Sequence, residues 1–371
     1  MENIKNSRIL RVTEFMKAQH LDAILVMNCY LGNWNTWLTG SERMPLHLPY
    51  NRNNVCFITP DGEVKQLCAR AYHPTDWFKF PLLENTKLPD TLKNGRLGLV
   101  NPSYLKKTVL DHLVVTYPGI QFVDVDTEFH QLKMEKTEEE ITRIENAAAL
   151  FDRVFTTLPL LMTNEPTERD LVVALRDRMR EMNAECEDLR SSTMVTLTSA
   201  PDGGPAVPEP IPYPGRRITY GDRVNVLVNG FMPGGFASAL GRTYILGEPT
   251  AEARAYWDLA VKAQSLLAEK AVPGTTVASL MEILEAEILV PNKLTLSNSM
   301  QVYGIGAAIQ EMPRNVDCSA MYPLKEGMTL VIAPKICPEG KDPYCCMDTF
   351  VVTKDGAKRL STTTQALCVL D

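Results

Sequence analysis

The chain has 371 residues, of which 45% are hydrophobic and 22% are charged. These fractions are those of an ordinary globular protein, and the length predicts two domains and excludes a single small module or a disordered chain. Thirty-eight basic and 45 acidic side chains give a net charge of -7 without a cluster of Lys or Arg, so we expect no nucleic-acid partner. No apolar stretch is long enough to span a bilayer and the first residues show no signal-peptide pattern, so we expect no membrane partner and a cytoplasmic location.

Nine cysteines are scattered along the chain without the paired spacing of a zinc site. A disulfide framework is not expected in a chain of this size. Adjacent cysteines rarely bridge each other, so we interpret Cys345 and Cys346 as small buried apolar residues.

Residues 1–132 alternate between helix-like and strand-like patches. Residues 23–27 and 54–58 are apolar runs typical of strands, and a Pro-Asp-Gly turn follows the second of them. This succession predicts an α/β domain. Residues 133–140 are charged, and we place the boundary with a second domain, residues 133–371, at this stretch.

The second domain begins with two predicted helices. Thr137 and Glu140 have the spacing of a capping box, in which the two side chains bond to each other's backbone N–H groups. Apolar residues then recur every three or four positions, which predicts a helix with one buried stripe; they are Ile141, Ile144, Ala148, Phe151, Phe155 and Leu158. Thr167 and Asp170 repeat the capping pattern before a second helix, whose inner face should carry Leu171, Leu175, Met179 and Met182.

The rest of the chain repeats this outline. Residues 200–215 are rich in Pro and Gly and are predicted to be a loop. Residues 223–229 alternate strictly, which predicts a half-buried strand with Val224, Val226 and Val228 on one face. Helical periodicity at 250–270 and 277–289 is followed by strand-like residues at 328–336 and 349–352. Two helices followed by sheet, twice over, predict an internally duplicated α+β domain.

Short motifs are spaced along the second domain. After the helix that starts at the Thr137 capping box come Gly221-Asp222, Gly241-Arg242-Thr243-Tyr244, Tyr303-Gly304-Ile305-Gly306, Glu311-Met312-Pro313-Arg314, Glu326-Gly327-Met328-Thr329 and Asp348-Thr349-Phe350. In order and spacing they resemble the pita-bread family of methionine aminopeptidase, aminopeptidase P, prolidase and creatinase. Residues 1–132 resemble the creatinase-type N-terminal domain. The resemblance therefore implies a creatinase-type α/β domain followed by a duplicated pita-bread α+β domain.

The resemblance also implies five metal-ligand positions. Most members of the family hold two divalent metals with two Asp, one His and two Glu, whose oxygen and nitrogen atoms suit such cations. In this chain the five positions fall on Val228, Ala239, Tyr303, Ala333 and Met347. None of these side chains replaces a carboxylate or an imidazole as a metal ligand, so we predict that the metal centre is absent and expect no other cofactor.

A placement that is wrong by one residue is the alternative. Asn229, Glu311 and Asp348 lie close to ligand positions, but a shift of one residue in a strand sends a side chain to the opposite face, and three independent shifts would be needed. All five histidines of the chain lie in the first domain, so the second domain has no imidazole of its own.

Creatinase is the family's precedent for the same scaffold working without metal. Its general base is a histidine at the position of Tyr303, and an aromatic-Xaa-Arg element from the partner subunit holds the substrate carboxylate. Tyr50-Asn51-Arg52 resembles that element, and a guanidinium suits forked carboxylate binding, although Arg52 in a surface ion pair is the alternative. Trp34 and Trp37 either line this site or pack in a core. The resemblance thus implies a homodimer in which each N-terminal domain completes the partner's pocket.

The predicted pocket has an apolar floor of Val228, Ala239, Ala333 and Met347. Its border would be formed by Tyr303, Gln310, Glu311, Arg242 and Cys345. A nearby arginine would lower the pKa of Tyr303 and allow acid/base work, whereas burial would raise it, and a role as a core aromatic also stays open. Glu311 either orients its loop or takes part in acid/base work, Arg242 is structural or binds substrate, and Cys337 or Cys345 would need a cationic setting to act as nucleophiles.

We therefore expect a metal-independent, creatinase-like enzyme that acts on a small carboxylate-bearing substrate, most simply by hydrolysing a non-peptide C–N bond. Arg52 would hold the carboxylate, Tyr303 would move the proton, and Gln310 or Glu311 would position water or substrate. A lyase with a tyrosine base would need the same parts. A non-catalytic descendant that binds a ligand or a protein is the second class of hypothesis, and a residual aminopeptidase with an unusual metal site is the least favoured.

Overall fold

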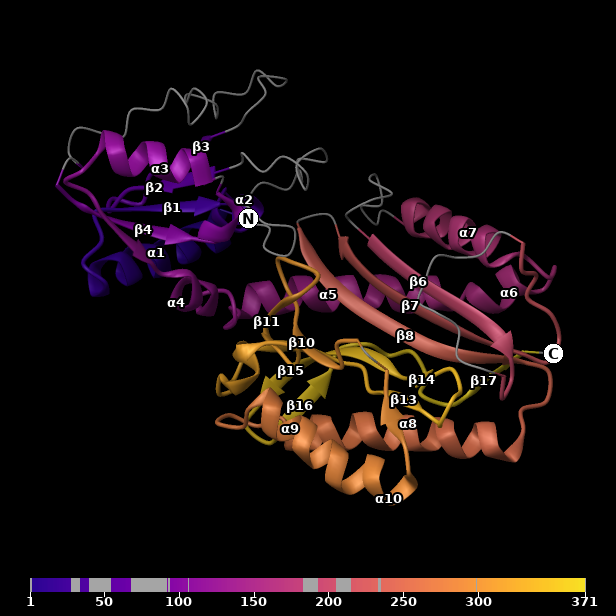
Figure 1. Ribbon diagram of the computed structural model, residues 1–371. Coiled ribbons are helices and arrows are strands. Elements are labelled where there is room, and N and C mark those ends of the chain that lie inside the picture. The colour runs from indigo at the N-terminus through magenta and orange to yellow at the C-terminus, as the bar shows by residue number, and fades with distance from the viewer. Residues whose placement is uncertain are drawn as a thin grey trace. The chain divides into compact units, whose positions relative to one another are not determined.

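A computed structural model describes residues 2–27, 34–39, 55–67, 92, 94–105, 107–182, 193–204, 215–232, 235–297 and 299–370. The chain divides into two compact units, Met1–Lys133 and Met134–Asp371. Each unit combines helices with a sheet, which confirms the expected α/β class (Figure 1).

The described residues of the first unit form a five-stranded sheet with the order β3-β2-β1-β4-β5. The central strand β1 (Ala23–Met27) pairs antiparallel with β2 (Val55–Ile58) and parallel with β4 (Arg96–Val100). The edge strands are β3 (Val64–Leu67) and β5 (Gln121–Asp124), and the helices are α1 (Glu2–Ala18), α2 (Trp34–Thr39), α3 (Lys107–Thr116) and α4 (Asp126–Gln131), with a 3₁₀ turn η3 (Pro102–Tyr104). Every residue of β1 is buried, as expected for a central strand between helices.

The second unit begins with helices whose starts were predicted. The Thr137 N–H donates to Glu140 Oε2 at 2.9 Å and the Glu140 N–H donates to Thr137 Oγ1 at 3.2 Å, so the capping box opens α5 (Glu138–Phe155). Thr167 and Asp170 cap α7 (Glu168–Glu181) in the same way. Because α5 ends at Phe155, Leu158 lies instead in the short α6 (Leu158–Met162).

A nine-stranded sheet forms the centre of this unit, and its main path is β11-β10-β12-β15-β8-β7-β6. These strands are β6 (Thr193–Pro201), β7 (Asp222–Met232), β8 (Phe236–Leu246), β10 (Val302–Gly304), β11 (Glu311–Arg314), β12 (Thr329–Ile332) and β15 (Met347–Thr353). Beside them, β16 (Gly356–Arg359) pairs with β15 and β17 (Cys368–Leu370) pairs with β8. A separate small sheet joins β9 (Thr295–Leu296), β13 (Lys335–Cys337) and β14 (Tyr344–Cys345).

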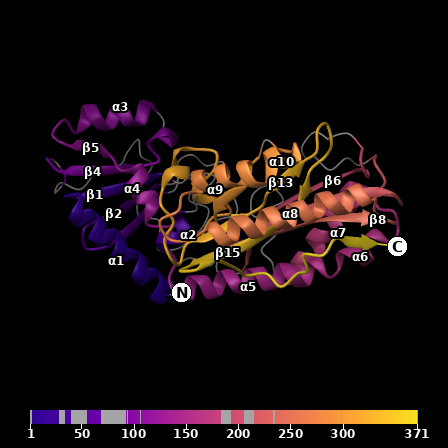
Figure 2. The same ribbon diagram turned by 90° about the horizontal axis from the view of Figure 1, so that it is seen from below.

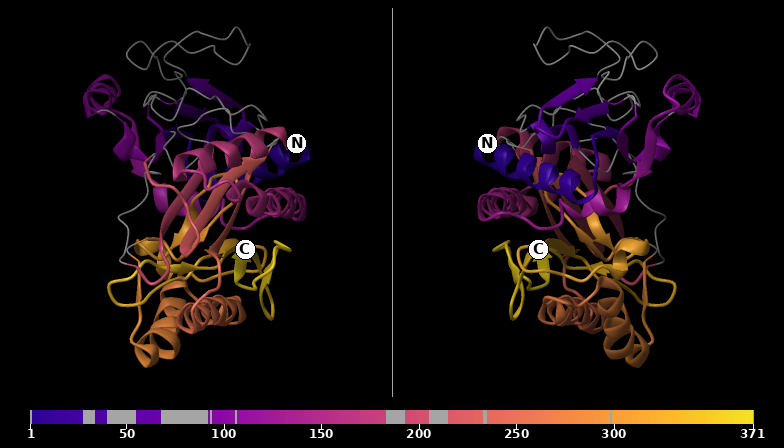
Figure 3. Two further views of the ribbon diagram at one scale, coloured as in Figure 1. Left: turned by 90° about the vertical axis from the view of Figure 1, so that its right-hand side faces the viewer. Right: turned by 90° about the vertical axis from the view of Figure 1, so that its left-hand side faces the viewer.

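Each half of the large sheet has its own helices, in keeping with the duplication predicted from the sequence. Residues of α5, α6 and α7 pack against β6, β7 and β8 in one core. Residues of α8 (Ala251–Lys270), α9 (Val277–Leu284) and the π-helical turn η4 (Glu285–Leu289) pack against β10, β12 and β15 in another. The short α10 (Val290–Asn292) and the 3₁₀ turn η5 (Cys318–Met321) complete this half. Figure 2 shows α8 running alongside the strands, and Figure 3 shows α5 and α8 nearly end-on, each beside its own half.

The two halves meet between β8 and β15, and the backbone junction is short. Only Met347 with Gly241 and Asp348 with Leu240 form the register between these strands. The Thr349 hydroxyl adds to it by bonding to the N–H of Ala239 at 2.9 Å and to its carbonyl at 3.1 Å. The groups that hold the junction therefore decide the geometry of any site along it.

Two predictions of local structure need correction. Ala200 and Pro201 lie in β6 and pair with β7, so the predicted loop starts after them, and residues 205–214 lie outside the described part of the chain. Residues 328–336 are two strands in different sheets, β12 and β13. An apolar run does not reveal the change of direction between them.

Candidate functional site

One face of the nine-stranded sheet turns away from the helices, and we call it the inner face. Strand alternation identifies it, because Val226, Leu240, Val302 and Ile332 belong to the helix-covered cores and their neighbours point the other way. The inner face therefore carries Asn225, Leu227, Asn229, Ala239, Gly241, Thr243, Tyr303, Val331, Ala333, Met347 and Thr349. These side chains are uncharged, but the same alternation also places Arg223 on this face, at one end of β7 near Asp202 and Asp342.

Val228 does not belong to this face, which corrects the predicted pocket floor. It is fully buried in the core with α5 and α7, beside Val226 and Leu240. Its neighbours Leu227 and Asn229 take the inner positions, because successive residues of a strand point to opposite faces. Neither of them is a carboxylate.

Tyr303 lies on the inner face and is 3% exposed. Its hydroxyl donates to Asn229 Oδ1 at 2.8 Å, and this hydrogen bond links β10 to β7. Burial raises the pKa of Tyr303 above its ordinary value of 10, and the bond to Asn229 offsets only part of that rise. The alternative of a lowered pKa is wrong, and the phenol stays neutral, able to donate a hydrogen bond.

The other three inner positions of the predicted metal centre are small or apolar. Ala239 is the direct cross-strand partner of Asn229. Met347 stands opposite Gly241, where an added Cβ would meet Leu227 and Met347 at 2.5 and 3.1 Å. Ala333 follows β12 and is fully buried. These residues fill the centre of the face with apolar atoms.

Glu311, expected to orient a loop or to take part in acid/base work, forms a buried ion pair with Lys136. Lys136 Nζ lies 2.8 Å from Glu311 Oε2, and both side chains are 3% exposed. The other carboxylate oxygen accepts from the Ala308 N–H at 3.0 Å. Gly306 makes room for this contact, since a Cβ there would meet the Lys136 side chain at 2.5 Å. The pair thus fixes the loop that leads to Gln310, which is half-buried.

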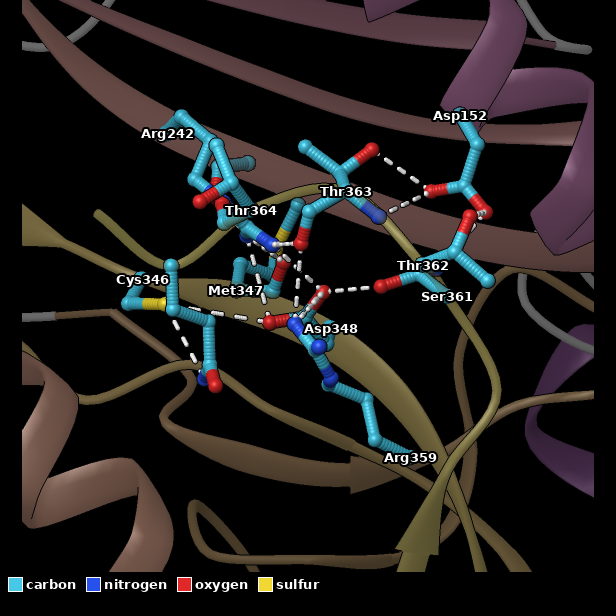
Figure 4. A network of polar contacts seen from close by, with 12 residues as sticks. Asp152, Arg242, Cys346, Met347, Asp348, Arg359, Ser361, Thr362, Thr363 and Thr364 are labelled. Carbon is cyan, nitrogen blue, oxygen red and sulfur yellow. Dashed lines mark hydrogen bonds and ion pairs between the residues drawn. The ribbon is translucent and has the colours of Figure 1, made fainter. Parts of the chain in front are cut away.

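Arg242 is directed away from the inner face and is engaged in a buried polar network (Figure 4). Its guanidinium donates to Asp348 Oδ1 at 2.9 Å and Oδ2 at 3.1 Å, and to the carbonyls of Met347, Thr363 and Thr364. Burial alone would lower the pKa of Arg242, but the Asp348 carboxylate raises it above its ordinary value. With these partners, Arg242 is placed to hold the chain together and is not directed towards a substrate on the inner face.

Neither Cys345 nor Cys337 has the lowered pKa that a nucleophile needs, although Lys335 acts to lower the pKa of both. Cys345 is buried, its backbone N–H donates to Thr243 Oγ1 at 3.1 Å, and burial raises the pKa of its thiol to about 12. Burial also raises the pKa of Cys337, to about 11. A thiol with such a pKa is almost entirely protonated at neutral pH.

The predicted residues of the first domain divide into two groups. Tyr50 and Arg52 lie outside the described residues. Trp34 is fully buried in the first unit, in edge-on contact with Trp37 at 5.4 Å between ring centroids and with Lys133 Nζ 3.7 Å from its own ring centroid. The structure therefore gives both tryptophans core contacts, the alternative to lining a substrate site.

The residues of the inner face do not fit the two-metal centre that the resemblance implies. A divalent metal pair needs several anionic oxygen ligands, and the inner face offers amides, hydroxyls and apolar groups. Asp348, a candidate if the alignment were shifted, faces the helix side and is bound to Arg242. Throughout the described part of the chain, no three His, Cys, Asp or Glu side chains are grouped as they would be to hold a metal ion.

Sequence reasoning missed several residues of this region. Asn229 was considered only as a shifted ligand, although a polar side chain in an apolar strand was a usable signal. Arg223 is fully buried at one end of β7, with its guanidinium 4.6 Å from the Tyr344 ring and 3.7 and 3.8 Å from Asp202 and Asp342. Nothing in local spacing signals these long-range partners.

Comparisons with known proteins agree with the fold. Residues 142–354, more than half of the chain, match the model of metallopeptidase family M24, and residues 8–134 match the creatinase/prolidase N-terminal domain. The chain belongs to the M24 family. This confirms the predicted resemblance and the creatinase-type domain followed by a pita-bread domain.

Relatives of the M24 family match this chain over nearly its whole length. An Xaa-Pro dipeptidase from Pyrococcus horikoshii is 25% identical over 98% of this chain and 99% of the relative, and one from Pyrococcus furiosus is 29% identical over 97% and 99%. The crystal structure of the prolidase from Pyrococcus horikoshii OT3 has a TM-score of 0.76 at 23% identity, covering 97% of this chain and 99% of that one. That last likeness shows the shared fold.

These comparisons overturn the function expected from the sequence. Relatives that span the chain are Xaa-Pro dipeptidases and the family is one of metallopeptidases, so they point to peptidase function. A metal-independent enzyme acting on a non-peptide C–N bond, together with its lyase and non-catalytic alternatives, is therefore not supported. The coarser expectation of a hydrolytic enzyme family is confirmed. Among the described helices, none is long and apolar enough to cross a membrane.

Proposed function

We propose that this chain is a hydrolase that acts on short peptides of the Xaa-Pro type, with the inner face of its second unit as the substrate site. The observation that carries the proposal is the match to two Xaa-Pro dipeptidases over at least 97% of this chain. The largely apolar inner face around Tyr303 supports it, because a proline ring is apolar and a peptide bond is satisfied by amide and hydroxyl partners.

Within this proposal the side chains have limited roles. Tyr303, a neutral phenol whose proton is donated to Asn229, would accept a hydrogen bond from a peptide N–H, and Gln310 would orient the peptide. Arg52 and Tyr50 keep the role proposed from the sequence, in which the guanidinium holds the terminal carboxylate of the peptide in a homodimer. Glu311 acts as a positioning residue through the loop that it fixes.

The test is release of free proline from Ala-Pro and Leu-Pro by the purified full chain, with Ala-Ala as the comparison substrate, with and without added Mn²⁺ or Co²⁺. We expect release from the Xaa-Pro substrates, a rise in KM for Arg52→Ala, and a fall in kcat for Tyr303→Phe. Tyr220→Phe is the matched control, because Tyr220 is 75% exposed and off the inner face. The proposal would be ruled out if the chain released no proline from any Xaa-Pro peptide and calorimetry detected no binding of these peptides.

A further inference from the structure

The hydrogen bond between Tyr303 and Asn229 joins strands that are not neighbours. Along the sheet, β12, β15 and β8 lie between β10 and β7, which makes four steps. At about 4.8 Å for each step, a flat sheet would separate these strands by roughly 19 Å, more than the two side chains can span. The 2.8 Å contact therefore requires that the sheet curls and that the bond crosses its inner face.

This bond lies among the positions where the family would place its metals. Tyr303 stands at the position of the histidine ligand, and Asn229 is the direct partner of Ala239, another ligand position. Leu227, Gly241 and Met347 are in close contact beside it. Asn229 is 9% exposed and Tyr303 is 3% exposed, so little solvent reaches the bond.

We propose that the Tyr303–Asn229 hydrogen bond stands in place of the metal pair, tying the two halves of the sheet together across the inner face, which takes no divalent cation. The proposal concerns the site of the proposed function and rests on that function only for the location of the peptide. A divalent cation loses most of its hydration when it is buried, and ligands such as carboxylates and imidazoles must compensate for that loss. The side chains around this bond include none of these ligands. The Asp342 carboxylate reaches the face at Asn225 and lies 3.8 Å from Arg223, and the Asn229 oxygen already accepts the Tyr303 hydroxyl.

Metal binding to the wild-type chain is the first test. The full chain, stripped with chelator and titrated with Mn²⁺ and then Co²⁺ in a calorimeter, should bind neither stoichiometrically, and elemental analysis should find less than about a tenth of an equivalent. One or two tightly bound equivalents of either metal would overturn the proposal.

Restoring ligands is the second test. Asn229→Asp and Ala239→Asp would place two carboxylates side by side, and Tyr303→His would bring an imidazole to the same point. We expect the triple variant to bind about one equivalent of Co²⁺. Asn229→Asp alone is the matched control, since its carboxylate still accepts the Tyr303 hydroxyl and should leave the chain metal-free. A folded triple variant that binds no Co²⁺ would contradict the placement of the bond at the metal position.

A double-mutant cycle tests the structural part and does not depend on metal. Tyr303→Phe removes the donor and Asn229→Leu replaces the acceptor by an apolar group of similar size. Each should raise the unfolding equilibrium constant in urea about fivefold, and the double variant should cost little more than one single change. Fully additive effects would show that the two residues do not act as a bridge.

These outcomes are separable from those of the proposed function. Proline release together with bound metal would keep the function and remove the bridge proposal. A metal-free, coupled Tyr303 and Asn229 with no peptide binding would keep the bridge and remove the function.

Discussion

The two sides of the junction between the halves of the large sheet are held in different ways. On the inner face, one neutral hydrogen bond crosses from β10 to β7. On the helix side, Arg242 and Asp348 form a fully buried ion pair, and Arg242 also donates to backbone carbonyls from two segments of the chain (Figure 4). The charged pair lies on the helix side among backbone carbonyls, whereas the bond across the inner face joins two uncharged side chains.

The helix side also anchors the C-terminal segment. Asp152 on α5 accepts from the backbone N–H groups and the hydroxyls of Thr362 and Thr363, at 2.6 to 2.9 Å. Ser361 donates to Asp348, and Thr363 and Thr364 offer carbonyls to Arg242. Because many bonds share few residues, loss of one charged group should affect the whole network, whereas loss of the inner bond should have a local effect.

The largest effect is expected for Asp348→Ala, which leaves the Arg242 guanidinium buried without its carboxylate. Breaking such a pair from one side costs about 3 to 5 kcal/mol of unfolding free energy, measured by urea denaturation. Glu248→Ala is the control, because Glu248 forms an exposed ion pair with Arg254 and its loss should cost less than about 1 kcal/mol. Equal costs for the two variants would show that Asp348 does not stabilise the network.

Asp152→Ala should have the next largest effect, a loss of about 2 to 3 kcal/mol, because hydrogen bonds to a charged acceptor are lost and buried donors stay unsatisfied. Asp152→Ala should accelerate amide hydrogen exchange more at Thr362 and Thr363 than in the interior of α5. The neighbouring exposed Arg153→Ala should change stability by less than about 0.5 kcal/mol. Unchanged exchange at Thr362 and Thr363 would mean that Asp152 does not anchor this segment.

Patterns among residues that are close in sequence predicted much of the fold, but they did not place every side chain on the correct face of the sheet. The capping boxes at Thr137 and Thr167 depend on residues three positions apart, so the sequence displays them directly. The alternation of β7 placed Val224, Val226 and Val228 together in a core, as found. The same alternation should have kept Val228 off the pocket floor, because one side chain cannot face both the core and the opposite side of the sheet.

The partners that define the site are distant in sequence. The contacts of Tyr303 with Asn229, of Glu311 with Lys136 and of Arg242 with Asp348 form only once the chain has folded. Folding brings strands that are distant in sequence together in one curled sheet. No spacing rule connects such residues, since their contact depends on strand order and register. Motif positions therefore identified Tyr303 as a site residue, but only the structure showed what it bonds to and that its pKa is raised.

The smallest effect is expected for Tyr303→Phe, and its sign should depend on pH. Near pH 8 the variant loses one hydrogen bond and should be less stable than wild type by about 1 kcal/mol. Below pH 10 the tyrosine is protonated in both folded and unfolded chains, so this difference should be constant. Above pH 10 the unfolded chain releases the Tyr303 proton while the folded chain retains it, because burial raises the pKa of the folded side chain.

Wild type should therefore lose stability with rising pH by up to about 1.4 kcal/mol per unit more than Tyr303→Phe, which has no phenol to titrate. The two urea midpoints should become equal at about pH 11, and above that pH wild type should be the less stable protein. The buried Tyr244 is present in both proteins, so its own raised pKa cancels from the comparison. Tyr220→Phe, which removes an exposed hydroxyl, should follow wild type throughout. A constant gap from pH 8 to 11 would mean that the phenol on the inner face titrates as an exposed one does, and the burial of Tyr303 would then be wrong.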